Sequence, residues 1–181
     1  MTVLPRDHEW TTADLALLPE DGLRYELVDG TLLVSPAPKL LHQRVQAALF
    51  RLLDSSVPEG TELLVAPVDF QPTNRRSLQP DLLVFPSADA DAAAVTTALL
   101  LAVEIVSPSS RNVDLVLKRA LYEEAGVAHY WAIDPESRTI LVWDLADGRY
   151  GEPRIVTDAG PVTIVAPVSL TLTAEAVFGP A

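Results

Sequence analysis

Two acidic residues in apolar segments are the strongest chemical signal in this sequence. Glu104 lies inside residues 99–106, a short and almost wholly apolar run that is followed by Ser107 and Pro108. Such a run predicts a strand that is buried on both faces. An ionised carboxylate there is costly unless a cation, a hydrogen-bond network or a metal compensates for its burial.

A second acid, Asp81, opens a similar apolar run over residues 81–85. Two acids at the ends of neighbouring buried strands form a set of oxygen donors typical of a site for a hard divalent cation. Structural alternatives remain open for both residues. Glu104 could form a buried pair with an arginine or a backbone amide, and Asp81 could cap the start of its strand after Pro80.

The elements that must position these acids alternate between helical and extended patterns. The sequence predicts helices over residues 11–18, 40–53 and 112–125. Strands are predicted over residues 23–28, 31–34, 61–66 with an extension at 68–71, 81–85, 99–106, 128–133 and 138–143, with further strands and one helical turn up to residue 178. Asp29 and Gly30 form a strong hairpin signal between the first two strands. This order predicts a mixed α/β fold with helices flanking a central sheet.

Composition narrows the class of protein. The 181 residues predict a single domain over residues 1–181, and the absence of cysteine excludes disulfides and thiolate metal sites. The net charge of −12 argues against a nonspecific coat on nucleic acid, although a local basic patch remains compatible with an enzyme that cleaves it. No signal-peptide layout and no apolar run of ~20 residues occur, so we expect a cytoplasmic protein without a membrane partner.

An ordered set of motifs resembles a known family. The set comprises Arg24 to Gly30, Ser35-Pro36, His42, Gln79-Pro80-Asp81, Val103 to Ser110, Asp114, Lys118, Tyr122, Gly126-Val127 and Tyr130 to Pro135. It is similar to the restriction endonuclease family that is expanded in cyanobacteria and actinobacteria, within the PD-(D/E)XK nuclease superfamily. The resemblance covers roughly residues 10 to 145. It implies a restriction-endonuclease-like fold, with a mixed central sheet flanked by helices and an N-terminal hairpin.

The sequence departs from the superfamily pattern at one position. A lysine normally follows the glutamate by two residues, on the same strand face, but Val106 stands there. The resemblance therefore implies that Lys118, which lies on the helix after this strand, performs the role of the missing lysine. Asp114, Lys118 and Tyr122 are spaced to share one face of that helix, where Asp114 and Tyr122 could support the site. The alternative for Lys118 is an ordinary exposed ion pair with Asp114.

The resemblance also implies roles for residues outside the two acidic strands. Glu26 could position water or a metal as an additional N-terminal acid, or it could face solvent. His42 could support the site, or it could cap or pack its helix. The candidates for a phosphate-facing patch, which are otherwise solvated charges, are Arg75, Arg76, Arg111 and Arg119.

The mechanism that follows is metal-dependent hydrolysis of a phosphodiester, with DNA as the expected substrate. Asp81, Glu104 and the backbone carbonyl of Ile105 would hold Mg²⁺ or Mn²⁺, while Lys118 would orient water or neutralise developing charge. An alternative from another class is an inactive nuclease-fold module that binds or scaffolds, as Val106 suggests. A glycosidase with paired carboxylates is a weaker third hypothesis. The apolar composition would allow a homodimer.

Overall fold

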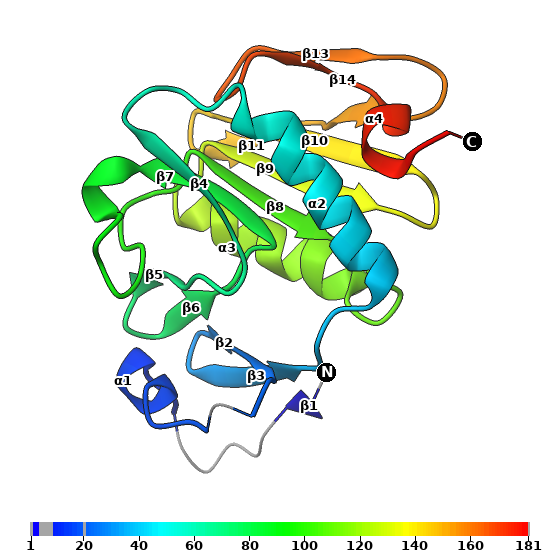
Figure 1. The fold of residues 1–181 in the computed structure, drawn as a ribbon. Coiled ribbons are helices and arrows are strands. Elements are labelled where there is room, and N and C mark those ends of the chain that lie inside the picture. Colours follow the sequence, from blue (N-terminus) through cyan, green and yellow to red (C-terminus); the bar gives the residue numbers. More distant parts are fainter. Residues whose placement is uncertain (1, 4–8, 20, 181) are drawn as a thin grey trace.

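The computed structural model describes residues 2–3, 9–19 and 21–180. Its largest sheet has the strand order β11-β10-β9-β8-β7-β4, and β12 also pairs with β10 (Figure 1). Strands β8 and β9 are parallel, whereas the other neighbours are antiparallel. The strands are β4 (Thr61–Val65), β7 (Leu82–Pro86), β8 (Leu101–Ile105), β9 (His129–Asp134), β10 (Thr139–Ala146), β11 (Arg149–Tyr150) and β12 (Arg154–Val156). The predicted mixed central sheet is confirmed.

Helical segments cover both faces of this sheet. The long helix α2 (Leu40–Asp54) crosses one face, and a continuous helical segment formed by η2 (Val113–Lys118) and α3 (Arg119–Glu124) lies behind the other (Figure 1). Three short elements complete the helical content of the described residues: α1 (Thr12–Leu15), η1 (Ser87–Asp89) and α4 (Ala174–Phe178).

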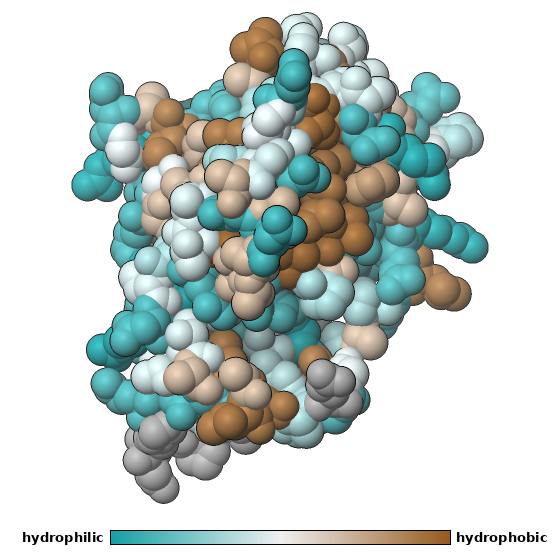
Figure 2. All heavy atoms as spheres, turned by 60° about the vertical axis from the view of Figure 1, so that its left-hand side comes forward, coloured by the Kyte–Doolittle hydropathy of each residue, from teal (hydrophilic) through white to brown (hydrophobic). Residues whose placement is uncertain are grey.

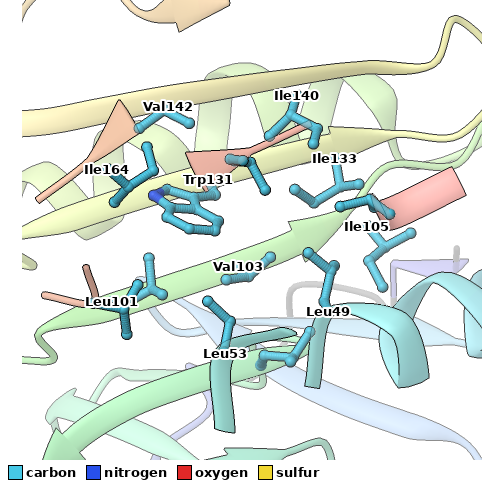
Figure 3. Packing of buried hydrophobic residues seen from close by; sticks show 14 of the residues in the cluster. Leu49, Leu53, Leu101, Val103, Ile105, Trp131, Ile133, Ile140, Val142 and Ile164 are labelled. Carbon is cyan, nitrogen blue, oxygen red and sulfur yellow. The ribbon is translucent and has the colours of Figure 1, made fainter. Parts of the chain in front are cut away.

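One hydrophobic core lies between α2 and the central sheet. Leu49 and Leu53 of α2 are fully buried and pack with residues of β8, β9 and β10 that include Val103, Trp131 and Ile140 (Figure 3). The apolar residues of α2 recur at helical spacing, so one face of the helix can bury them together. Helix α2 packs on β8 in this core, and the side chain of His42 in the first turn of the helix reaches Asp81.

The opposite face of the sheet carries a second core. Strand β8 is buried along its whole length, and its side chains alternate between the faces. Leu101, Val103 and Ile105 belong to the core under α2, whereas Ala102 belongs to the second core. Alternation therefore directs Glu104 to the same face as Ala102, the face that η2 and α3 cover.

A second, N-terminal sheet has the order β1-β3-β2-β6-β5 and lies below the central sheet in Figure 1. Its strands are β1 (Thr2–Val3), β2 (Arg24–Val28), β3 (Thr31–Ser35), β5 (Phe70–Thr73) and β6 (Arg76–Leu78), and a separate pair joins β13 (Val162–Ile164) to β14 (Leu170–Leu172). Asp29 has φ 48° and Gly30 has φ 81°, so both turn residues adopt the positive φ of a tight hairpin. The predicted N-terminal hairpin, formed by β2 and β3, is confirmed.

Three predicted elements differ from the structure. The first helix is confined to Thr12–Leu15 and is shorter than predicted. The strand predicted over residues 61–71 is divided, because β4 ends before Pro67, which has no N–H to donate, and β5 joins the other sheet. The helix predicted over residues 112–125 contains a π-helical segment, η2, which hydrophobic periodicity of 3.6 residues does not reveal.

The surface is mixed in polarity. Figure 2 shows one face on which a band of apolar side chains runs between polar ones. Exposed apolar residues include Leu64 and Val65 of the edge strand β4. In the part of the chain that the structure describes, no helix has the length and apolar character to cross a membrane.

Candidate active site

A pocket of about 460 Å³ lies where β2, the start of α2, the end of β8 and η2 meet. Seven of the residues predicted for the site line it: Glu26, His42, Asp81, Glu104, Ile105, Asp114 and Lys118. These residues come from elements far apart in the sequence, so the fold has gathered them around one cavity. Ser107 to Ser110, Pro36 to Pro38 and Pro135 form other parts of the wall.

Asp81 lies immediately before β7 and opposite Glu104. Leu82 pairs with Val103 in the antiparallel ladder, so the next position in this register places Asp81 against Glu104. Residues directly opposite in such a ladder have Cβ atoms about 4.5–5.5 Å apart. The Oδ2 atom of Asp81 accepts a hydrogen bond of 2.7 Å from the backbone N–H of Ile105, which ties the carboxylate to the end of β8.

Three further groups hold Asp81. Its Oδ1 atom accepts a hydrogen bond of 2.9 Å from Arg24, and its Oδ2 atom lies 3.0 Å from Nε2 of His42. The side chain of Gln46 donates to the Asp81 backbone carbonyl at 2.8 Å. Burial by itself would raise the pKa of Asp81, but the hydrogen bond from His42 and the charge of Arg24 lower it to about 2. Asp81 is therefore an ionised carboxylate at neutral pH.

Glu104 is only 2% exposed and faces the helical segment. Its Oε1 atom accepts hydrogen bonds from Lys118 at 3.0 Å and from the Tyr122 hydroxyl at 2.7 Å. Burial raises the pKa of Glu104 to about 8; the charge of Lys118 opposes this shift, and the charges of neighbouring carboxylates add to it. Without a metal, the site therefore favours a proton on Glu104 near neutral pH.

Lys118 bridges two acids. Its Nζ atom lies 2.7 Å from Glu26 and 3.0 Å from Glu104, and its side chain is 3% exposed. Burial alone would lower the pKa of Lys118, but Glu104 and then Glu26 raise it above the ordinary value. Lys118 is thus a fixed positive charge and not a proton acceptor at neutral pH. The alternative of an ordinary exposed ion pair with Asp114 is wrong, because Lys118 is buried.

Glu26 is buried and does not face solvent, so that alternative is also wrong. Besides the contact with Lys118, its Oε1 atom accepts a hydrogen bond of 2.9 Å from the backbone N–H of Gln79. This bond links β2 to the segment that leads into Asp81. Glu26 therefore connects the N-terminal sheet to the acidic centre of the pocket.

The π-helical segment η2 turns polar side chains inward. Asp114 and Lys118 are buried, whereas Val116 is 63% exposed and Leu117 is 37% exposed. Burial of charged residues beside exposed aliphatic ones is the reverse of normal amphipathic patterning, and π-helical turns are frequent at functional sites. Asp114 accepts a hydrogen bond from the Ser110 hydroxyl, and burial raises its pKa to about 6.

Arg24 and Gln46 also contact Asp81, although neither residue was predicted for the site. Local spacing contains a signal for both. Arg24 precedes Glu26 by two positions, so the two side chains share one face of β2. Gln46 follows His42 by four positions and lies on the same face of α2.

The four arginines predicted to face phosphate lie elsewhere in the described structure, and none lines the pocket. Arg75 contacts Glu9 and the Asp29 carbonyl, and Arg76 pairs with Asp29 and Glu124. Arg111 pairs with Asp134, and the guanidinium of Arg119 lies 5.8 Å from the centroid of the Trp143 ring. The pocket itself contains Arg24, Lys39, His42 and Lys118 as its basic residues.

The charges around the pocket do not balance. Four carboxylates are buried there (Glu26, Asp81, Glu104 and Asp114), and two permanently cationic side chains, Arg24 and Lys118, contact them. Lys39 and Glu136 are at the exposed rim. If all four acids were ionised, their negative charges would outnumber the positive charges of Arg24 and Lys118. The site can lower this charge by retaining protons or by binding a cation.

The donors fit a cation that needs few protein ligands. Among the described residues, no group of three or more histidines and acids is arranged to hold a metal ion. Asp81, Glu104 and Ile105 still provide hard oxygen donors at one wall of the pocket. Mg²⁺ commonly takes one or two carboxylates and completes its coordination with water and substrate phosphate.

The fold of this chain is similar to that of a solved structure described as a putative nuclease belonging to DUF820 from Anabaena variabilis. The two structures have a TM-score of 0.78 and 21% sequence identity, over 93% of this chain and 97% of the other. This similarity establishes the fold.

The model of the Uma2 family, described as "Putative restriction endonuclease", matches residues 12–175. The chain belongs to this family, and the resemblance inferred from the motifs is confirmed. No curated protein matches the chain.

Proposed function

We propose that this protein is a metal-dependent endonuclease that hydrolyses phosphodiester bonds in DNA. The observation that carries the proposal is the cluster of four buried carboxylates around one pocket, with fewer permanent cations than acids. Burying so many acids is costly in a purely structural role, since well-packed apolar residues would avoid the desolvation. Family membership supports the same reaction class.

Asp81, Glu104 and the Ile105 carbonyl would hold Mg²⁺ or Mn²⁺. When bound, such an ion supplies Lewis-acid stabilisation of the phosphate and lowers the pKa of water. The hydrogen bonds described for Glu104 both end on Oε1, so its Oε2 atom is the oxygen that remains for a cation. Asp81 has three described partners on its two oxygens, fewer than the roughly four lone-pair sites of a carboxylate.

The other residues would act by position and charge. Lys118 provides a permanent positive charge beside Glu104, which would stabilise negative charge that develops on the phosphate. Tyr122 holds Oε1 of Glu104, and Glu26 holds Lys118 in place. His42 and the Ile105 N–H fix Oδ2 of Asp81, so the carboxylate is orientated before any ligand arrives.

A cleavage assay tests this proposal. The purified protein is incubated with Mg²⁺ or Mn²⁺ and with DNA and RNA substrates, in parallel with Glu104→Ala. We expect metal-dependent cleavage of DNA that the substitution lowers by about 10²–10³-fold or more, as for loss of a group that stabilises transition-state charge. Glu123→Gln is the matched control, because Glu123 is a half-buried acid that binds the Tyr150 N–H outside the pocket. Cleavage that survives in Glu104→Ala would reject the site.

A second candidate function is that of an inactive nuclease-fold module that binds or scaffolds. Val106 in the position usually held by lysine, and the neutralisation of Asp81 by Arg24, favour it. Calorimetric titration separates the two proposals, since the endonuclease must bind Mg²⁺ or Mn²⁺ at millimolar concentration and the module need not. A homodimer and a single domain over residues 1–181 remain predictions.

A further inference from the structure

Arg24 has no role in the mechanism above, although it contacts the acid that would hold the metal. It extends from β2 of the N-terminal sheet, and its side chain is 20% exposed at the pocket. One terminal nitrogen donates to Oδ1 of Asp81 at 2.9 Å, and the other donates to the Gln79 carbonyl at 3.3 Å. Arg24 is therefore the arginine that lines the pocket in the described structure, whereas the arginines expected to face phosphate lie outside it.

The two oxygens of Asp81 have different surroundings. Oδ2 is held by His42 at 3.0 Å and by the backbone N–H of Ile105 at 2.7 Å. Oδ1 is held by Arg24. Oδ1 has fewer partners than Oδ2, so it is the oxygen that a metal ion would bind. The metal ion and the guanidinium of Arg24 would therefore compete for Oδ1.

Other basic groups of the pocket are less suited to such an exchange. Lys118 is enclosed between Glu26 and Glu104, with a side chain that is 3% exposed. Lys39 lies at the exposed rim. Arg24 combines contact with the acid, partial exposure and a long hydrogen bond to Gln79, so a short movement would take its guanidinium from Asp81 into the cavity.

We propose that Arg24 is a cation that holds the metal position in the ligand-free protein and that binds the substrate phosphate once a divalent ion occupies Asp81. This inference rests on the proposed nuclease function and adds a phosphate-binding residue to it. A guanidinium can bind phosphate through two parallel hydrogen bonds, and it keeps its charge after leaving the carboxylate. The exchange would keep the charge of Asp81 compensated at every stage.

Two measurements on Arg24→Ala test the exchange, and they change in opposite senses. In calorimetric titration with Mg²⁺ or Mn²⁺ and no nucleic acid, we expect affinity to increase on the order of tenfold, because the ion no longer displaces a guanidinium. In binding of a DNA duplex with Ca²⁺ in place of Mg²⁺, we expect the slope of log K against log salt to fall in magnitude by about 0.9, the value for one lost phosphate contact.

Arg154→Ala is the matched control. Arg154 also donates through one terminal nitrogen to a carbonyl, that of Thr163, and through the other to an acid, Asp144. It lies on β12, outside the pocket lining, so we expect neither the metal affinity nor the salt slope to change. Arg24→Gln gives the same two measurements with a neutral side chain of similar polarity if the alanine variant folds poorly.

The outcomes separate this inference from a structural role and from the proposed function. If Arg24 only orientates Asp81, its removal will weaken metal binding or leave it unchanged, which overturns the inference. A salt slope equal to that of the unaltered protein overturns the phosphate contact. If the unaltered protein binds no divalent cation and cleaves no substrate, the proposed function fails and the inference fails with it.

Discussion

Lys118 lies 3.0 Å from Glu104, although one residue belongs to a π-helical segment and the other to the central strand β8. The same ammonium group contacts Glu26 at 2.7 Å, so a single cation joins the central sheet to the N-terminal sheet. The side chain at the usual lysine position, Val106, is buried in the core on that face. The positive charge beside Glu104 thus comes from the helix that packs over this residue. The sequence of strand β8 alone does not supply it.

Replacing Lys118 with methionine should destabilise the protein and abolish most cleavage. Two buried acids would lose their shared cation, and breaking a buried pair in this way costs about 3–5 kcal/mol. Cleavage should fall by about 10²–10³-fold through loss of electrostatic stabilisation. Urea unfolding and the cleavage assay measure the two effects.

Lys39→Met is the control for this substitution, because Lys39 is the other lysine of the sequence and is exposed. Its effect on the free energy of unfolding should stay within about 0.5 kcal/mol. Adding Glu104→Gln to Lys118→Met should restore part of the lost stability, since fewer charges are then left unpaired. A double variant that is no more stable than Lys118→Met would contradict the pairing.

Tyr122→Phe should weaken metal binding with only a modest loss of stability. Its hydroxyl donates to Oε1 of Glu104 at 2.7 Å, and losing a partner that orientates a metal ligand typically lowers metal affinity by about 10-fold or more. Tyr150→Phe is matched to it, because the Tyr150 hydroxyl donates to the Val127 carbonyl at 2.7 Å outside the pocket. Each variant should lose about 1 kcal/mol of stability. Equal metal affinities in the two variants would exclude this role for Tyr122.

The metal-free protein should lose stability as pH rises from about 5 to about 8. Burial raises the pKa of Glu104 to about 8 from an ordinary value of 4.5, so in this range the folded state binds a proton that the unfolded state has released. The free energy of unfolding should then fall by up to about 1.4 kcal/mol per pH unit. Asp114, with its pKa raised to about 6, adds to the dependence below that pH.

Unfolding by urea in the presence of a chelator measures this dependence. Glu104→Gln should lack the part between pH 6 and 8, and saturating Mg²⁺ should reduce it in the unaltered protein because the ion replaces the proton. An undiminished slope in Glu104→Gln would assign the dependence to other groups.

Leu49→Ala should lower stability without altering the site. Leu49 is fully buried between α2 and the sheet, where such truncations cost about 2–5 kcal/mol. At a temperature where the variant is folded, its affinity for Mg²⁺ should match that of the unaltered protein. A weakened affinity would show that packing of α2 controls the position of His42.

The sequence predicted the elements well where a local pattern controls them. The hairpin at Asp29 and Gly30, the long helix α2 and the buried strand around Glu104 depend on turn chemistry and on the periodicity of apolar residues. The π-helical segment η2 was not predicted, because a hydrophobic periodicity of 3.6 residues does not distinguish it from an α-helix. Asp114 and Lys118 are the buried residues of this segment.

The sequence by itself determined that two acids belong to strands whose apolar residues must be buried, so that the acids are removed from water with them. Strand alternation further required Glu104 to share a face with Ala102. Only the tertiary structure decided their partners, since Arg24 reaches Asp81 across 57 residues and His42 reaches it across 39. Local periodicity specifies which side of an element is buried, whereas contacts between distant segments depend on how the sheets and helices pack. For this reason the arginines that were predicted to face phosphate are not the arginine that lines the pocket, Arg24.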